Sequence, residues 1–499
     1  MSPRRWAGAL LPLAAGALLA LAACSTKKTL VPDVPPETGV FVKGELDTVN
    51  HIVQLFWFGN DADGMVVGFE LRFVNPAAPA DTDWVFTTRT DSIFTVYTPG
   101  GFTAPRFEVR AIDDAGQHDP SPAIADFSFT NLPAVVTITG APAARDSVYA
   151  TATIDWSTVD PDGIVNRISY RVWLDGNEAN ARIVTDRTYS IPPADFIDGG
   201  QVRAGTRYFV VQPIDDGGLV GTADTATFFV RDAAGARLLV IDDVPSSQQL
   251  NYTTDQLYYE AAQRALGPGP PAPGSAWSLL LLEFNRPFRS ITDLEQTLSQ
   301  FDAVIWYRGD LPAAPLGPAS PLRDYQDALV SYVESGGHLL VEGRGLFQST
   351  DVAGTTTGSL RPDLAPRLFG GDLVRREIQG RPGDSTTVFG INNGRSLKTS
   401  MWSDSLRFQA ARDGLFCFHY GDTNQVAFWA PPGELASGHP GNPPEHLAVG
   451  KSVPHPGGGR AIVLAFPLRV GNGFTAPPNP SVGTVPRILD RIFAQLLGP

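Results

Sequence analysis

Charged side chains recur at one kind of position in the second half of the chain, directly after short apolar runs. The runs span residues 238–241, 279–282, 303–307 and 338–341. The charged residues that follow them are Asp242, Asp243, Glu283, Arg308, Asp310, Glu342 and Arg344. Parallel strands would gather these side chains at the carboxyl edge of one sheet, where open α/β sheets bind ligands. There they would either bind a polar ligand or a protein loop, or neutralise one another as an ion-pair network.

Aspartates form a second group, in two matched sets in the first half of the chain. The sets are Asp61, Asp63, Asp113 and Asp114, and Asp160, Asp162, Asp215 and Asp216. Carboxylates that converge repel one another unless they share a hard cation such as Ca²⁺. Counted from Asp61, the twelfth residue is Arg72, so the loop is not an EF-hand, which needs a glutamate there. Asp-Gly and Asp-Pro pairs also form turns unaided, and we therefore expect weak Ca²⁺ binding or none.

The chain has two cysteines, and their surroundings differ. Cys417 lies in the apolar run Leu415-Phe416-Cys417-Phe418, so we predict that it packs in a core and is inert. Cys24 follows Leu21-Ala22-Ala23, at the end of a short apolar stretch with a basic start. This arrangement resembles the lipobox of bacterial lipoproteins, which implies cleavage before Cys24 and lipidation of that residue. Cys417 then has no disulfide partner within the chain.

The resemblance to a lipoprotein predicts the first segments of the chain and its location. Residues 1–23 would be the signal peptide, because their apolar stretch is short for a membrane span. Residues 24–38 would be a lipidated, Pro-rich tether that holds the next domain away from the membrane. Ser25 follows the cysteine, which in enterobacterial lipoproteins goes with the outer membrane. We expect a membrane-anchored protein of the bacterial cell envelope, at the outer membrane, on its periplasmic or surface face.

An internal repeat of about 100 residues carries the two aspartate sets. Trp57 and Trp156 are 99 positions apart, and each precedes an Asp-x-Asp-Gly turn. A second landmark, Ile-Asp-Asp-x-Gly, starts at Ile112 and again at Ile214, 102 positions later. Flanking runs alternate apolar and polar residues, as half-buried antiparallel strands do. The pattern resembles fibronectin type III and related Ig-like domains, which implies two all-β sandwiches over residues 39–131 and 132–232.

Residues 236–499 are predicted to form an α/β domain, because helical segments separate the apolar runs. The order of elements resembles the class I glutamine amidotransferase-like fold, a flavodoxin-like three-layer sandwich. That family places a Cys nucleophile in the turn after a central strand, and a His and a Glu after a late strand. Gly343, Pro467 and Arg469 stand at these places. All three catalytic roles are therefore predicted to be vacant, since none of these side chains supplies a nucleophile and its base.

Charge and composition limit the partners and leave two classes of function open. The 499 residues carry a formal net charge of −14, so nucleic acid would be repelled. No histidine grouping has metal-ligand spacing, and no cofactor is expected. In the first class, which the vacant triad favours, two sandwiches hold up a non-catalytic α/β domain that binds an envelope protein or a glycan. In the second, a hydrolase or amidotransferase relative uses the strand-end carboxylates in a rearranged active site.

Overall fold

The computed structural model describes most of the N-terminal half of the chain and a discontinuous part of the C-terminal half. The described residues are 32–42, 51–79, 83–144, 146–233, 235–244, 254–270, 275–282, 287–308, 321–343, 360–370, 447–465 and 484–498, with short pieces between 346 and 430. Of the residues predicted to matter, Cys24, Glu283, Asp310, Arg344, Pro467 and Arg469 lie outside them.

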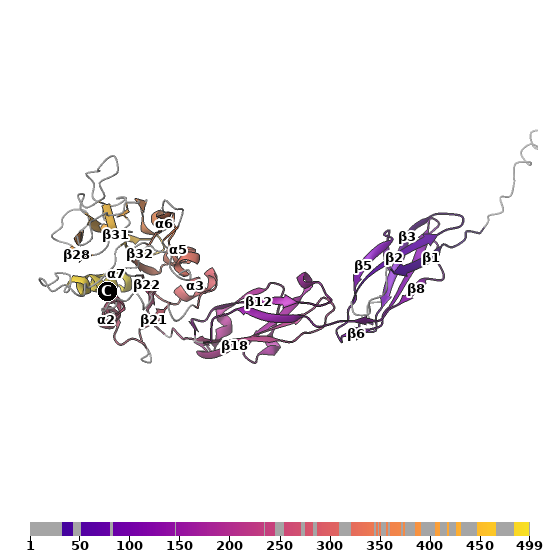
Figure 1. Cartoon of the computed structure of the whole chain (residues 1–499), viewed down its shortest axis with the longest axis horizontal. Coiled ribbons are helices and arrows are strands. Elements are labelled where there is room, and N and C mark those ends of the chain that lie inside the picture. Colours follow the sequence, from indigo (N-terminus) through magenta and orange to yellow (C-terminus); the bar gives the residue numbers. More distant parts are fainter. Residues whose placement is uncertain are drawn as a thin grey trace, which may run out of the picture. The chain divides into compact units, whose positions relative to one another are not determined.

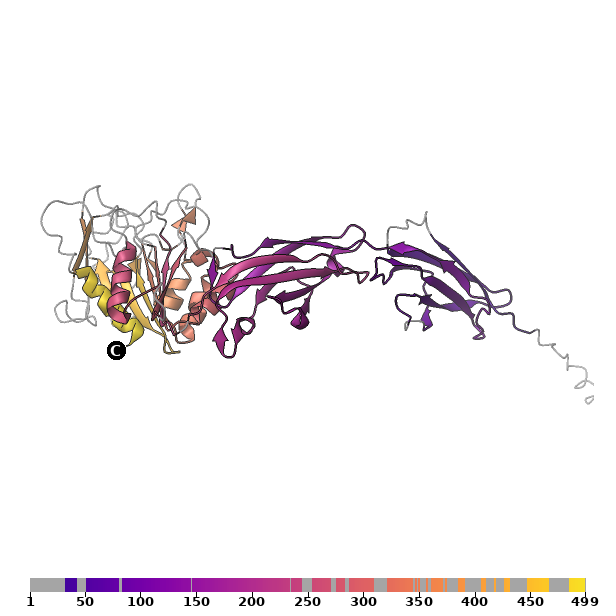
Figure 2. The same ribbon diagram turned by 90° about the horizontal axis from the view of Figure 1, so that it is seen from below.

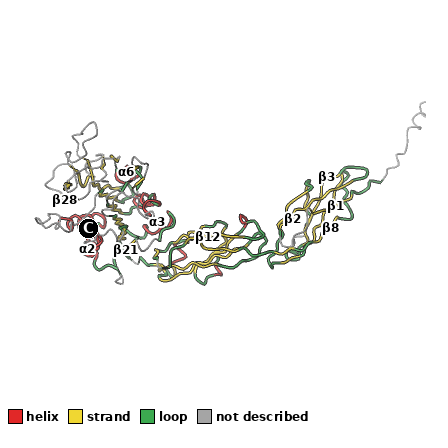
Figure 3. The backbone as a smooth tube through the Cα atoms, viewed as in Figure 1, coloured by secondary structure: helices red, strands yellow, loops and turns green. Residues whose placement is uncertain are grey.

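By its contacts the chain forms two compact units. The first comprises the residues up to 133 together with residues 160–166 and 215–220, and the second comprises the remainder. Strands, yellow in Figure 3, make up most of the regular structure that the described residues form. None of the helices in the described part of the chain is long and apolar enough to cross a membrane.

The first unit contains two sheets that enclose one apolar core. One sheet has the order β1 (Glu37–Val42), β2 (Ile52–Asn60), β5 (Asp91–Thr95). The other has the order β4 (Val85–Thr87), β3 (Val66–Val74), β7 (Arg106–Asp113), β8 (Ala123–Asp126), and β6 (Phe102–Thr103) pairs with β9 (Phe129–Thr130). Trp57 of β2 packs against Phe69 and Phe107 of the opposite sheet, with ring centroids 6.4 and 5.8 Å away. The predicted half-buried strands are confirmed, because buried and part-exposed residues alternate along β7.

The second sandwich belongs to the second unit, apart from its two acidic loops. One sheet has the order β10 (Val135–Gly140), β12 (Ala152–Val159), β15 (Thr188–Ile191). The other has the order β11 (Ser147–Val148), β19 (Asp224–Val230), β18 (Gly205–Ile214), β13 (Ser169–Leu174), β14 (Arg182–Val184). Short 3-10 turns, η1 (Val165–Arg167), η2 (Glu178–Asn180) and η3 (Pro193–Phe196), and the hairpin of β16 (Ile197–Asp198) and β17 (Gln201–Val202) complete it. Trp156 packs against Tyr170 and Phe209, as Trp57 does against its own opposite sheet.

The C-terminal part of the second unit is built on a parallel sheet (Figure 1). The parallel strands lie in the order β21 (Trp277–Leu281), β20 (Leu238–Asp242), β22 (Ala303–Tyr307), β23 (His338–Glu342), β32 (Arg460–Leu464). Numbered along the chain, this order is 2-1-3-4-5. Antiparallel strands extend the sheet beyond β32, in the order β31 (Leu447–Pro454), β30 (Val426–Ala430), β27 (Ser385–Gly390), β28 (Ser405–Gln409). Four further short strands are β24 (Ser349–Thr350), β25 (Thr356–Thr357), β26 (Leu373–Val374) and β29 (Cys417–Phe418).

Helices cover both faces of the parallel sheet (Figure 2). On one face α2 (Thr254–Leu266) and α7 (Thr484–Leu497) pack on alternate strand residues such as Val240 and Ile305. On the other, α3 (Ile291–Leu298), α5 (Asp327–Glu334) and α6 (Leu364–Phe369) pack on residues such as Ile241 and Trp306. Burial on both faces explains why these strands read as continuous apolar runs.

Two details differ from the expectations. The segment between the apolar runs 303–307 and 338–341, which was expected to be helical, contains two helices, α4 (Pro321–Asp324) and α5, with Tyr325 and Gln326 between them. The apolar periodicity continues across this break, so the sequence did not reveal it. The antiparallel extension of the sheet was also not predicted beyond isolated strand-like pieces. The sandwich-like sheets are confirmed, whereas the assignment of residues 236–499 to the glutamine amidotransferase-like family stays a prediction.

Candidate functional site

The described strand-end residues lie at one edge of the parallel sheet. Asp242 ends β20, Glu342 ends β23, and Asp243 and Arg308 directly follow β20 and β22. Backbone hydrogen bonds continue the ladder past the strand ends, since the Asp243 N–H donates to the Tyr307 carbonyl at 3.1 Å. The Arg308 N–H likewise donates to the Glu342 carbonyl at 2.9 Å. The backbone that carries Asp243 and Arg308 is therefore held by the same hydrogen-bond ladder as the strands.

The charged side chains at this edge are engaged with one another and with the backbone. Arg308 Nε lies 3.2 Å from Asp243 Oδ2, and the arginine side chain is only 4% exposed. Trp306 Nε1 donates to the same Asp243 oxygen at 3.3 Å. Asp242 Oδ1 accepts a hydrogen bond from the Val244 N–H at 2.9 Å. These contacts tie neighbouring strand ends together and leave little of the described charge directed at solvent.

Glu342 is fully buried beneath α2, next to a pair of tyrosines. Tyr258 of α2 stacks on Tyr307 of β22, with ring centroids 4.5 Å apart. Burial, and after it the negative charge of Glu342, raise the pKa of Tyr258 well above its usual value. The phenol therefore stays protonated at neutral pH and cannot act as a general base there.

The turn after β23 carries no nucleophile in the described residues. Gly343 has φ of 149° and donates its N–H to the Leu464 carbonyl at 3.1 Å. The resemblance to the amidotransferase-like family predicts a cysteine at this position, and that correspondence stays a prediction. Cys417 lies on the short strand β29. The other two predicted vacancies, Pro467 and Arg469, lie outside the described residues.

In the first aspartate set, every carboxylate accepts a hydrogen bond from a backbone amide. Asp61 Oδ1 accepts from the Asp63 N–H at 3.2 Å. Asp113 Oδ1 accepts from the N–H groups of Ala115 and Gln117 at 2.9 and 2.7 Å. The other two members of the set bind amides elsewhere: Asp114 Oδ1 accepts from Met65 and Asp63 from Val34. Asp114 thus contacts the loop that carries Asp61, so the two acidic loops of the first sandwich lie side by side.

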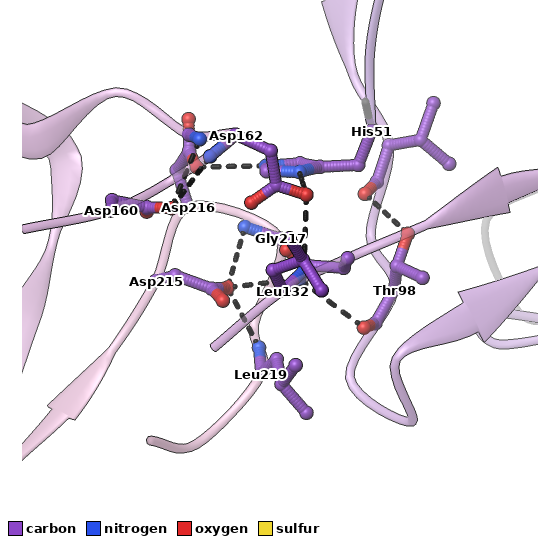
Figure 4. Close-up of polar contacts among 12 residues, drawn as sticks. His51, Thr98, Leu132, Asp160, Asp162, Asp215, Asp216, Gly217 and Leu219 are labelled. Carbon is purple, nitrogen blue, oxygen red and sulfur yellow. Dashed lines mark hydrogen bonds and ion pairs between the residues drawn. The ribbon is translucent and has the colours of Figure 1, made fainter. Parts of the chain in front are cut away.

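The second set repeats this arrangement (Figure 4). Asp160 Oδ1 accepts from the Asp162 and Gly163 N–H groups at 3.3 and 3.0 Å. Asp215 Oδ1 accepts from the Gly217 and Leu219 N–H groups at 3.0 and 2.8 Å. The other two members also bind amides: Asp162 Oδ2 accepts from Leu132 at 3.0 Å and Asp216 Oδ2 from Ile164 at 3.3 Å. The turn interpretation accounts for these hydrogen bonds in both sets.

A histidine that the sequence did not single out lies among the second set (Figure 4). His51 is fully buried, and its Nε2 lies 2.8 Å from Asp216 Oδ1. Its Nδ1 lies 3.8 Å from Asp162 Oδ2. No sequence signal marks His51, because it stands alone before a strand and more than 100 residues from its partners. The imidazole therefore offers the second set a polar contact from outside its two acidic loops.

The electrostatics of the second set penalise the ionised form of one carboxylate. Burial raises the pKa of Asp160, and the neighbouring charges of Asp215 and Asp162 raise it further, against the opposing effect of its two amide hydrogen bonds. Within the described residues, no three acidic, histidine or cysteine side chains are already gathered as a metal site.

A cavity of about 680 Å³ opens on the second sandwich, between β13, β14 and η3. Its polar rim includes Arg182, whose guanidinium is held by the Tyr189 hydroxyl at 2.7 Å and by Asp195. Trp173 and Phe209 also line it. The charges of Arg182 and Asp195 neutralise each other at this rim.

Comparisons with known proteins find likeness only in solved structures. No protein-family model and no curated protein matches the chain. The fibronectin(III)-like modules of Clostridium thermocellum CbhA match 39% of this chain and 95% of their own, with 15% identity and a TM-score of 0.19. The FN1–FN3 domains of chicken CNTN1 match 40% of this chain and 68% of their own, with 15% identity and a TM-score of 0.18. Both are modules of the class that the repeat resembles, but scores this low carry no functional argument.

Proposed function

We propose that this chain is a lipid-anchored protein of the bacterial cell envelope, with a non-catalytic role. Cys24 carries the anchor, and the two sandwiches form a stalk. The stalk presents the C-terminal domain, a degenerate glutamine amidotransferase-like module with the 2-1-3-4-5 strand order of flavodoxin-like sheets. The module binds an envelope protein or a glycan.

The observation that carries the proposal is the junction between the second sandwich and the parallel-sheet domain. Asp293, in the first turn of α3, is 1% exposed and forms a capping box with Ser290. Its Oδ1 also accepts hydrogen bonds from two hydroxyls of the sandwich, Thr153 at 2.9 Å and Thr151 at 3.2 Å. One carboxylate thus caps a helix of one domain and binds a strand of the other. A flexible linker between independent domains would not need such a contact.

Apolar packing at the same junction joins the two domains into one core. Tyr149, in the sandwich, is fully buried in the cluster that contains α3 and α5. Its ring meets Phe301 edge-on, with centroids 5.4 Å apart. Its backbone carbonyl accepts a hydrogen bond from the Gln300 side chain. Because interiors are close-packed and deform little, this shared core supports a second sandwich that holds the module in a fixed orientation.

The strand-end geometry supports a non-catalytic module. In the described residues Arg308 is buried in its ion pair with Asp243, and Gly343 offers no side chain at the nucleophile turn. A catalytic unit that lacks its nucleophile retains only the effects of binding and positioning. Binding through the surface of the module therefore fits these residues better than turnover.

Cross-linking of intact cells, followed by mass spectrometry of the purified full-length chain, tests this proposal. The stalk model predicts cross-links from an envelope partner to residues 236–499 in wild type, and their loss on membrane release by Cys24→Ser. Partners that cross-link only to residues 39–232 would contradict it. Ammonia release from glutamine by the purified chain should stay at buffer level. Turnover that Cys417→Ala abolishes would instead favour the rearranged-enzyme alternative.

A further inference from the structure

The two aspartate sets share a feature that turn formation does not explain. At two matched positions of each set, a carboxylate has one oxygen buried with no hydrogen-bond donor. The atoms are Oδ2 of Asp61 and Asp113 in the first set and Oδ2 of Asp160 and Asp215 in the second. Asp113 and Asp215 are 1% and 4% exposed. Because these are matched positions of the repeat, the unpartnered oxygens are a feature of both copies and not a peculiarity of one loop.

A buried carboxylate oxygen without a donor is costly, because it has lost water and gained nothing in return. Buried polar groups nearly always find a partner, so a recurring exception indicates a ligand that the protein side chains do not supply. A cation satisfies several such oxygens at once and removes the repulsion between the carboxylates.

The glycine of each Asp-x-Asp-Gly turn shows that oxygens from both loops approach one point. A Cβ on Gly64 would stand 2.5 Å from Asp61 Oδ2 and 2.5 Å from Asp114 Oδ1. These two oxygens are thus no more than about 5 Å apart, which two ligands of one Ca²⁺ ion at 2.3–2.6 Å can span. On Gly163, a Cβ would likewise meet Asp160 Oδ2 and, at 2.6 Å, Asp216 Oδ1.

The second set offers further oxygen donors. Asp162 Oδ1 and the side-chain oxygen of Asn131 are also buried without a hydrogen-bond donor. Asn131 is 4% exposed, and its Nδ2 donates to Asp215 Oδ1 at 3.1 Å. Carboxylate and amide oxygens, without thiolate, are the donor set that Ca²⁺ prefers.

We propose that each aspartate set binds one Ca²⁺ ion, through Asp61, Asp113 and Asp114 in the first and the matched Asp160, Asp215 and Asp216 in the second, where Asp162 adds a fourth carboxylate. In neither set are three of these carboxylates already close enough together to coordinate one ion. The ion therefore draws the carboxylates inward as it binds. Each site joins the loop after the tryptophan strand to the loop at the end of the late strand. Calcium therefore stabilises the acidic end of each repeat. This inference does not depend on the partner or the anchor proposed above.

Calorimetric titration of the full-length chain in detergent micelles, after removal of divalent ions, tests it. The wild type should bind two Ca²⁺ per chain, and Asp61→Asn and Asp160→Asn should each bind one. Asp186→Asn, which changes an exposed aspartate outside both sets, should still bind two. Absence of saturable binding at millimolar Ca²⁺, or a stoichiometry of two in both set variants, would overturn the proposal.

Melting temperatures measured in EDTA and in Ca²⁺ distinguish loss of Ca²⁺ binding from poor folding of a variant. Ca²⁺ should raise the melting temperature of the wild type by several degrees, because a ligand of the native state alone stabilises it. In EDTA, each Asp→Asn variant should melt at or above the wild type, since it removes one repelling charge. A variant that melts far lower in EDTA would show a structural role for the carboxylate, and equal wild-type melting in EDTA and Ca²⁺ would refute the sites.

Discussion

Replacing Thr153 by Val and Asp293 by Ala, singly and together, tests the contact that joins the second sandwich to the parallel-sheet domain. The Thr153 hydroxyl donates to Asp293 Oδ1 at 2.9 Å in a buried setting. A hydrogen bond to a charged group contributes about 1.5–3 kcal/mol. Thr153→Val should therefore destabilise by about 1–2 kcal/mol, because valine keeps the shape and removes the donor.

Asp293→Ala should cost more, because four donors lose their acceptor. Besides the two threonine hydroxyls, the N–H groups of Arg289 and Ser290 donate to Asp293 Oδ2 at 2.9 and 3.2 Å. Loss of a helix cap costs about 0.5–2 kcal/mol, and each unsatisfied buried donor adds about 1–3 kcal/mol. Allowing for water and rotated hydroxyls, we expect about 3 kcal/mol in total. The double variant should cost about 1.5 kcal/mol less than the two single costs combined, since both remove the same contact.

Hydrogen exchange of the amides in β12 and α3 measures these free energies within the full chain. Asp302→Ala is the matched control, because its ion pair with Arg237 is half exposed and such pairs contribute about 0–1 kcal/mol. Additive costs for Thr153→Val and Asp293→Ala would refute the reasoning. They would mean that the hydroxyl and the carboxylate do not meet in solution.

Three further outcomes follow from the same structure. Burial raises the folded-state pKa of Asp293 above its usual 3.8. The protonated carboxyl therefore adds its full contribution to stability below pH 3.8, and this contribution is lost as the pH rises through the folded-state pKa. Asp293→Asn should flatten this part of the pH–stability curve. Gly457→Ala should destabilise by about 1–3 kcal/mol, because its Cβ would meet the Glu334 carbonyl, whereas Gly176→Ala, with open space around it, should change unfolding by under about 0.5 kcal/mol. A fatty-acid analogue fed to cells should label the wild type and not Cys24→Ser, and equal labelling would contradict the lipoprotein prediction.

The parallel strands could be predicted because each is buried on both faces. Each of the five contains an apolar run, Ala461 to Leu464 in the last of them, and the polar residues that follow the other four locate the carboxyl edge. The tryptophans and acidic turns of the repeat located the two sandwiches in the same way, since Trp57 and Trp156 fill equivalent core positions. Both signals are local in the sequence: the apolar runs recur with each strand, and the tryptophan and acidic turn recur with each sandwich.

Contacts between distant segments could not be predicted. Ser290 and Asp293 form a capping box that a local motif can show, but nothing in the sequence links Asp293 to Thr153, 140 residues earlier. His51 is similar, because its partner Asp216 is 165 residues away. Solitary polar residues become informative only when the fold brings them together.

The distance between spin labels on the second sandwich and on the parallel-sheet domain tests the central claim most directly. One label is attached at Ile183→Cys, an exposed position of β14, and the other at Gln263→Cys, an exposed position of α2. The two native cysteines are removed by Cys24→Ser and Cys417→Ser. A sandwich that shares its core with the module predicts one narrow distance distribution, which broadens when Thr153→Val and Asp293→Ala are added. A broad distribution in the otherwise unaltered chain would show two independently moving domains and would contradict a stalk that presents the module in a fixed orientation.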